Sequence, residues 1–155
     1  MSERSIGWAF VAGQTILIVT LIAVPGADHW PTPAWIEVAG LTLVIVGIGV
    51  IAVAALRLGP ALTPTPVPTT DARLRTDGLY RWVRHPIYTG VLLAVAGVTV
   101  RSGSLVTLAV AGVTFGFFTA KARWEERRLR ERFPDYSAYA ARTPRFLPRP
   151  PRSSS

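Results

Sequence analysis

The sequence contains no cysteine and only two histidines, His29 and His85, in 155 residues. Without cysteine the chain forms no disulfide, holds no metal through thiolates and has no cysteine nucleophile. We expect the two histidines to lie on opposite sides of a membrane, with His29 in a solvated loop. This separation excludes a metal site built from a pair of histidines, so no metal is expected.

Charged residues are also scarce, at 17% of the chain against 50% that are hydrophobic. The length corresponds to one domain, which we expect to cover residues 1–155. A formal net charge of +8 is compatible with nucleic acid, but the basic residues share the chain with long uncharged runs. Acidic headgroups of a lipid bilayer are therefore the simpler partner, and we expect no nucleic acid.

Two apolar runs in the first half are each long enough to cross a bilayer core of roughly 30 Å. Residues 6–24 carry no charge and one strongly polar residue, Gln14, and residues 38–56 form the second run. A cleaved signal peptide is the alternative for the first run, but no small-x-small cleavage site follows it. We expect two transmembrane helices, joined by a turn that places Trp30 and Trp35 at the interface.

Residues 47–52 of the second run formally match the dinucleotide-binding pattern G-x-G-x-x-A. That pattern requires a strand, a tight turn and then a helix. Gly47 and Gly49 instead lie within one uninterrupted apolar run, so we interpret them as small residues for close helix packing.

The second half begins with a proline-rich stretch, residues 59–70, in which neither a helix nor a paired strand can form. We expect a stiff linker along the membrane surface. Two further apolar runs, residues 86–100 and 104–120, are separated by three turn residues and predict a tight antiparallel hairpin. Gly112 and Gly116 are expected to let the two helices of this hairpin pack closely.

The fold class that follows is an all-α integral membrane protein with four transmembrane helices. Basic residues gather on one side of this arrangement and leave Arg101 alone on the other. The positive-inside rule then places both termini in the cytoplasm, and the composition favours a bacterial inner membrane. Residues 121–155 are expected to form a cytoplasmic amphipathic helix, stopped by Pro134, and a disordered tail rich in proline and arginine.

The motif R-H-P-I-Y-T-G, at residues 84–90, lies where a basic stretch becomes apolar. Pro86 suits the first position of a helix, and the free N–H groups at a helix N-terminus attract anions. His85 and Tyr88 fall on one face of that helix, beside Arg84. The motif therefore predicts a site for an anionic ligand at the membrane surface. The alternative is an anchor, with the arginines among lipid phosphates and Tyr88 in the aromatic belt.

Glu125 and Glu126 stand in a strongly cationic stretch one turn beyond the last apolar run. Part of this charge is paired within the helix, as for Glu126 with Arg130 four residues later. A solvated helix face is one interpretation. The other is that two acids on the same side of the membrane as His85 bind a cationic group.

Taken together, the R-H-P-x-Y-x-G block, the proline-rich linker and the R-W-E-E segment at residues 123–126 resemble the isoprenylcysteine carboxyl methyltransferase family and related membrane phospholipid methyltransferases. The resemblance covers roughly the second half of the chain. It implies an integral-membrane enzyme that binds S-adenosylmethionine between the two blocks on the cytoplasmic side. By position, it implies cofactor contacts from His85, Pro86, Tyr88, Gly90, Glu125 and Glu126, with aromatic faces from Tyr80 and Trp124. Catalytic roles fall to Arg84, His85 and Glu126.

The resemblance also implies a lipophilic methyl acceptor dissolved in the membrane. A carboxylate is the simplest acceptor, because its charge cancels that of the sulfonium in the transition state and no base is needed. Arg84 or Arg81 would then steer the carboxylate. An amine acceptor, as in phospholipid N-methylation, must lose a proton, for which His85 or a glutamate is the available base.

Two non-enzymatic functions remain as alternatives. A small transporter or channel subunit is disfavoured, because no ionisable residue lies in the middle of a predicted span. The other alternative is a structural or regulatory membrane protein whose basic tail binds anionic lipid or a protein partner.

Overall fold

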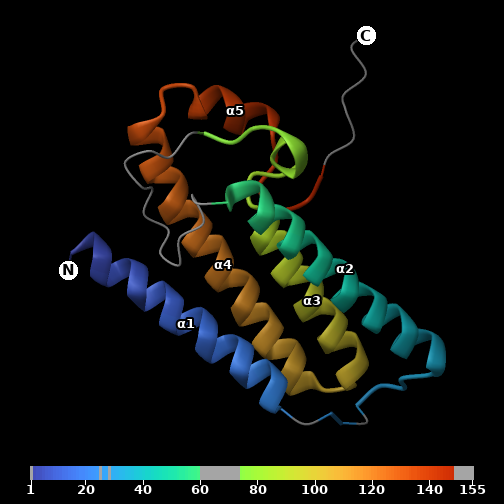
Figure 1. Ribbon diagram of the computed structural model, residues 1–155. Helices are drawn as coiled ribbons and strands as arrows, with labels where there is room; N and C mark the ends of the chain where they lie inside the picture. Colours follow the sequence, from blue (N-terminus) through green and yellow to red (C-terminus); the bar gives the residue numbers. More distant parts are fainter. Residues whose placement is uncertain (1, 25, 28, 60–73, 149–155) are drawn as a thin grey trace.

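The computed structural model describes residues 2–24, 26–27, 29–59 and 74–148. These ranges contain helices and no strand (Figure 1). The elements are α1 (Glu3–Ala23), α2 (Ala34–Leu58), the 3₁₀ helix η2 (Gly78–Arg81), α3 (Pro86–Ser102), α4 (Leu105–Arg132) and α5 (Tyr136–Arg142). The all-α prediction is confirmed for this part of the chain. Nearly all of the proline-rich linker and the last seven residues lie outside it.

Three of the helices are long and apolar enough to cross a membrane: α1, α2 and α4. Each contains one of the apolar runs that predict spans, and α4 continues from its apolar part into the charged segment without a break. The fourth predicted span corresponds to α3, an apolar helix of 17 residues. The prediction of apolar helices that can span a membrane is thus confirmed for three helices. The fourth, α3, is shorter than the length required of a span.

The closest helix pair is α2 with α3, which run side by side along most of their length (Figure 1). Glycines of the two helices face each other: a Cβ added at Gly47 would lie 2.5 Å from the Gly90 carbonyl oxygen, and one at Gly90 would lie 2.6 Å from that of Gly47. Gly40 and Gly97 form a second such pair. The packing interpretation is therefore confirmed for Gly47 and wrong for Gly49, where an added Cβ would meet no atom of the described residues within 4 Å. The position of both glycines inside α2 excludes a dinucleotide loop.

The connection between α3 and α4 is as tight as predicted, with Gly103 in a left-handed conformation at φ 58° and Ser104 capping α4. The prediction that Gly112 and Gly116 pack these helices closely is wrong. A Cβ at either glycine would meet no atom of the described residues within 4 Å. The reason is that α3 presents its own glycines to α2, and this pair takes the close approach.

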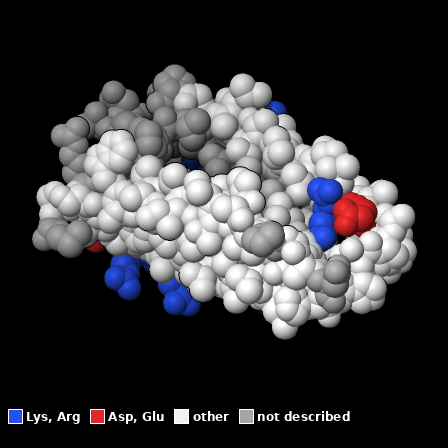
Figure 2. All heavy atoms as spheres, turned by 90° about the horizontal axis from the view of Figure 1, so that it is seen from below, with Lys and Arg blue, Asp and Glu red and all other residues white. Residues whose placement is uncertain are grey.

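The two ends of the helices differ in structure. At one end the α1–α2 connection lies on the α3–α4 turn, with hydrogen bonds from the Ala27 N–H to the Ser102 carbonyl (2.8 Å) and from the His29 N–H to the Gly103 carbonyl (3.0 Å). Figure 2, the view from this end, shows a largely uncharged surface. At the other end α4 extends beyond its apolar part, and α5 folds back over the start of α3 (Figure 1). His29 and His85 therefore lie at opposite ends.

Candidate functional site

The R-H-P motif begins α3 as predicted, with Pro86 as its first residue and His85 just before it. The His85 carbonyl accepts hydrogen bonds from the backbone N–H (2.9 Å) and the hydroxyl (3.1 Å) of Thr89. The imidazole of His85 is buried. It points towards the charged extension of α4, which brings the two predicted blocks together.

Glu126 is the centre of a buried ionic cluster, with its side chain 1% exposed. Arg145 binds it through two hydrogen bonds, from Nε to Oε1 and from Nη2 to Oε2, both 2.8 Å. Arg84 Nη1 lies 3.3 Å from Oε1 and His85 Nε2 lies 3.1 Å from the same oxygen. The predicted pair with Arg130 is present but longer, at 3.8 Å. A buried carboxylate requires such paired cations, so this cluster fixes α4 against the start of α3.

Glu125 lies next to this cluster and is more accessible, with its side chain 24% exposed. Its Oε2 accepts a hydrogen bond of 2.9 Å from the Tyr88 hydroxyl and lies 3.5 Å from His85 Nδ1. The rings of His85 and Tyr88 stack in parallel, with centroids 5.2 Å apart. His85 therefore bridges the two carboxylates and is held in position by an aromatic ring.

The electrostatic setting of His85 favours its charged form. Burial alone would lower the pKa of this imidazole, but hydrogen bonds and charge from Glu125 and Glu126 outweigh burial. The pKa of His85 is consequently raised above its ordinary value of 6.5. The two carboxylates therefore stabilise the charged form of the imidazole between them.

Residues 143–148 cross the start of α3 and complete the site. Arg84 and His85 donate their backbone N–H groups to the carbonyls of Pro144 (2.9 Å) and Arg145 (3.2 Å). The Thr89 hydroxyl donates to the Phe146 carbonyl at 2.8 Å. The expectation of a disordered tail is therefore wrong for this stretch, while residues 149–155 lie outside the described residues.

Arg145 and Phe146 are the site residues that the sequence reasoning missed. The one available signal is an aromatic residue in a run otherwise rich in proline and arginine, because aromatic side chains gain most by burial. Phe146 is indeed buried, and its ring lies 6.1 Å from that of His85. Nothing in the sequence identifies Glu126, nineteen residues earlier, as the partner of Arg145.

Three buried tyrosines support the cluster from the side of η2 and α5: Tyr80, Tyr136 and Tyr139. The Tyr139 hydroxyl donates to the Tyr80 carbonyl, which joins α5 to η2. Burial, with the nearby charge of Glu126, raises the pKa of Tyr136 to about 12. Burial likewise raises the pKa of the Tyr80 and Tyr139 hydroxyls. All three therefore stay protonated at neutral pH and serve as neutral supports.

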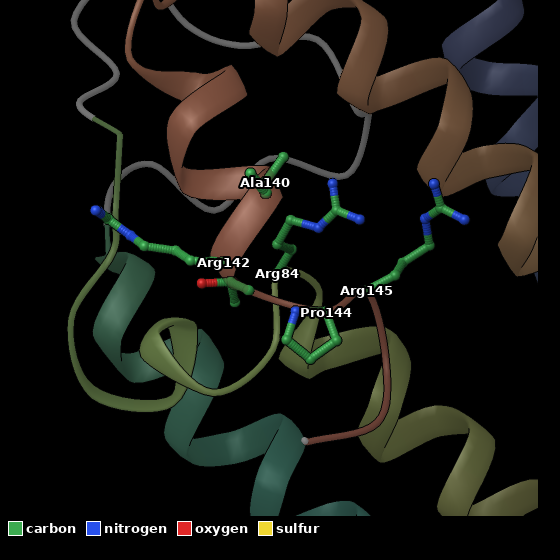
Figure 3. A pocket seen from close by; sticks show the side chains of 7 residues that line it. Arg84, Ala140, Arg142, Pro144 and Arg145 are labelled. Carbon is green, nitrogen blue, oxygen red and sulfur yellow. The ribbon is translucent and has the colours of Figure 1, made fainter. Parts of the chain in front are cut away.

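A pocket of about 280 Å³ opens beside the cluster. Its lining consists of Arg84, Ala140, Ala141, Arg142, Thr143, Pro144 and Arg145. Figure 3 shows the side chains of Arg84 and Arg145 extending in the same direction, while Arg142 points away from them. Arg84 and Arg145 both bind Glu126 and also line the pocket, so the pocket lies next to the ionic cluster.

The remaining predicted residues are placed less centrally. Pro86 and Gly90 are buried in α3, and Gly90 faces α2. The Trp124 side chain of α4 faces α1, where its ring centroid lies 5.5 Å from that of Phe10. The Arg128 guanidinium lies 3.4 Å from the centroid of the Trp124 ring. Within the described ranges, no group of three or more acidic or histidine side chains is arranged to hold a metal ion.

Comparison with known proteins identifies the family. Residues 35–136 match the family model described as phospholipid methyltransferase. The chain belongs to this family. The predicted resemblance to membrane phospholipid methyltransferases and isoprenylcysteine methyltransferases is thereby confirmed, and the two motif blocks both lie within the matched range.

Over the aligned residues, curated relatives are about one third identical to the chain. It is 34% identical over 151 residues to the cobalt-zinc-cadmium resistance protein CzcN of Cupriavidus metallidurans, covering 96% of this chain and 66% of that protein. The nickel-cobalt-cadmium resistance protein NccN of Alcaligenes xylosoxydans xylosoxydans is 32% identical over 138 residues, 88% of this chain and 62% of that protein. Protein-S-isoprenylcysteine O-methyltransferase B of Arabidopsis thaliana is 31% identical over 136 residues, with coverages of 84% and 67%. The chain thus spans under two thirds of the length of the two resistance proteins.

Proposed function

We propose that the chain is an integral-membrane methyltransferase that uses S-adenosylmethionine, with residues 1–155 forming one methyltransferase domain. The observation that carries this proposal is the cluster of His85, Tyr88, Glu125 and Glu126, which unites the two motif blocks at one end of the helices. Membership of the phospholipid methyltransferase family supports methyl transfer as the chemistry.

The residues of the cluster fit the amino-acid end of S-adenosylmethionine, which carries an ammonium and a carboxylate. Glu125 is partly exposed and no arginine of the described residues pairs with it, so it is the carboxylate that would bind the ammonium. Glu126 is already enclosed by Arg84, His85 and Arg145. We therefore assign Glu126 and Arg84 the role of positioning His85 beside Glu125.

The remaining groups of the cofactor match the aromatic and cationic lining of the site. The start of α3 at Pro86 offers backbone N–H groups for an anion. Of the aromatic residues expected to contact an adenine, Trp124 is covered by the Arg128 guanidinium, Tyr88 stacks on His85 and Tyr80 is buried, so the adenine would have to replace one of these contacts. Gly90 lets α3 approach α2 closely enough to hold this start in place. When bound, the cofactor would supply an activated methyl group on a sulfonium.

We propose a lipophilic carboxylate as the methyl acceptor. The Arabidopsis relative is named as an O-methyltransferase of isoprenylcysteine, and a carboxylate needs no base. For the competing N-methylation of an amine, the available bases are His85 and Glu125. The raised pKa of His85 disfavours the neutral form that a base requires, and Glu125 is the carboxylate that we assign to the cofactor ammonium. The pairing of His85 with two carboxylates therefore favours O-methylation.

The topology we propose has four spans, with α3 as the fourth. Its 17 residues extend about 26 Å at 1.5 Å per residue, close to the bilayer core of roughly 30 Å. We propose that this end, with both termini, lies in the cytoplasm at a bacterial inner membrane, and the arginines of the site and of α5 support this by the positive-inside rule. The charged part of α4 and α5 would then lie at the membrane surface as a C-terminal amphipathic unit.

The activity is tested with membranes that contain the protein, lipid extract and S-adenosylmethionine labelled in its methyl group. We expect label in the lipid fraction that is released as methanol by mild base, because methyl esters hydrolyse and methylamines do not. The Glu125→Gln variant should lose most of this label, whereas Glu131→Gln, an exposed acid of the same helix, should keep it. Base-stable label would contradict the carboxylate acceptor, and no label above control membranes would contradict the enzyme.

A further inference from the structure

Lys121 is a buried cation that the ionic cluster does not use. Its side chain is 3% exposed and lies one turn before Glu125 on α4. Its Nζ donates a hydrogen bond of 2.5 Å to Gln14 Oε1 of α1. The same nitrogen lies 5.2 Å from the centroid of the Tyr88 ring and 5.9 Å from that of Phe118.

An ammonium in this setting is not needed to hold α1 against α4. Aromatic contacts already join the two helices, with ring centroids of Phe10 and Phe117 at 5.7 Å and of Phe10 and Trp124 at 5.5 Å. A buried charge in a membrane helix is costly and is usually retained for a function. The ammonium has three N–H donors, of which the Gln14 amide oxygen takes one.

Tyr88 separates this cation from the acid that we assign to the cofactor. The Tyr88 hydroxyl is bonded to Glu125, while the face of its ring is turned to Lys121. Opposite charges thus lie on the two sides of one aromatic side chain. Arg84 and Arg145 are both paired with Glu126, so neither offers a free charge to an acceptor.

We infer that Lys121 binds the carboxylate of a lipophilic methyl acceptor, which replaces the Gln14 amide as the partner of the ammonium. The inference rests on the proposed methyltransferase function and deepens it, because it names the residue that binds the carboxylate of the acceptor. A protonated amine would be repelled by Lys121, so the site discriminates against the substrates of N-methylation. Lys121 takes the steering role that the sequence suggested for Arg84 or Arg81.

Binding of two matched lipids tests this inference: oleate, which carries a carboxylate, and oleyl alcohol, which has the same chain without the charge. In neutral detergent, we expect oleate to raise the melting temperature of the full chain by about 3 °C more than oleyl alcohol. Lys121→Met should abolish this difference, and Lys121→Arg should keep it. Gln14→Leu is the matched control, because it breaks the same hydrogen bond from the other side and should keep the preference for oleate.

Three results would overturn the inference: equal shifts for the two lipids in the wild type, an unchanged preference in Lys121→Met, or loss of the preference in both Lys121→Met and Gln14→Leu. The last result would show that the hydrogen bond between Lys121 and Gln14 only holds α4 against α1. Binding of S-adenosylmethionine is measured on the same wild-type sample. If the cofactor binds and oleate shows no preference, the inference alone fails. If oleate is preferred and no cofactor binds, the anionic site stands and the methyltransferase proposal fails.

Discussion

At the scale of single residues, the two adjacent glutamates of the site differ in burial and in their partners. Glu126 is enclosed by cations and holds α3, α4 and the segment at residues 143–148 together. Glu125 is more accessible, and among the described residues the charged or hydroxyl groups that it contacts are those of His85 and Tyr88. The sequence could predict that the pair matters, but not which acid is enclosed, because this depends on Arg145.

The charge of His85 gives a pH dependence to stability. Its pKa is raised in the folded protein, so its contribution is complete below the ordinary value of about 6.5 and is lost as the pH rises through the raised value. We expect the melting temperature of His85→Gln to fall furthest below that of the wild type near about pH 6 and to approach it towards about pH 9. Thermal unfolding in detergent across this pH range measures the difference in melting temperature between the two proteins. A difference that grows with pH would contradict a stabilising ion pair between His85 and the glutamates.

At the scale of secondary-structure elements, the helix bounds follow from the sequence and the helix neighbours do not. Apolar runs and Pro86 locate α1, α2 and α3 to within a few residues, and Pro134 follows the end of α4, but the sequence predicts neither η2 nor α5. Small residues, however, look alike in a sequence whether they face a helix or open space. Gly47 meets α3, whereas Gly112 meets no atom of the described residues within 4 Å. Which small face is used depends on tertiary pairing, which no local pattern encodes.

The close approach of α2 and α3 predicts opposite effects at two neighbouring glycines. Gly47→Ala places a Cβ 2.5 Å from the Gly90 carbonyl, so we expect a loss of about 1–3 kcal/mol in the free energy of unfolding. Gly49→Ala, in the same helix, meets no atom of the described residues within 4 Å and should be neutral or stabilising by up to about 1 kcal/mol. Denaturant unfolding of both variants in the same detergent provides the comparison. Equal changes in the free energy of unfolding for the two variants would show that α2 and α3 do not approach as closely at Gly47 as the structure indicates.

At the scale of the whole molecule, an end with few charges, among them the exposed ion pair of Arg101 and Glu37, and an ionic end lie on opposite sides of the apolar helices. The connections at the first end show little charge (Figure 2), whereas arginines cover the second. This asymmetry extends the sequence-based positive-inside argument to the folded molecule. In the orientation that we propose, the residues assigned to the cofactor lie on the side where a water-soluble cofactor is available.

The absence of cysteine makes this orientation directly testable, because an introduced cysteine is the sole thiol in the chain. We expect Arg101→Cys, at the exposed end of α3, to react with a membrane-impermeant maleimide in intact bacterial cells. Ser137→Cys, exposed on α5, should react only after the cells are opened. The reverse labelling pattern would contradict a cytoplasmic site.

The central claim is that S-adenosylmethionine binds where the two motif blocks meet, and calorimetric titration of the detergent-purified protein with lipid restored tests it most directly. Wild-type protein and Glu131→Gln should bind the cofactor with the same affinity. Glu125→Gln should bind at least about tenfold more weakly, because it loses a charge-assisted hydrogen bond to the ammonium. Saturable binding that is indifferent to Glu125, or a folded wild type that binds nothing, would contradict the account.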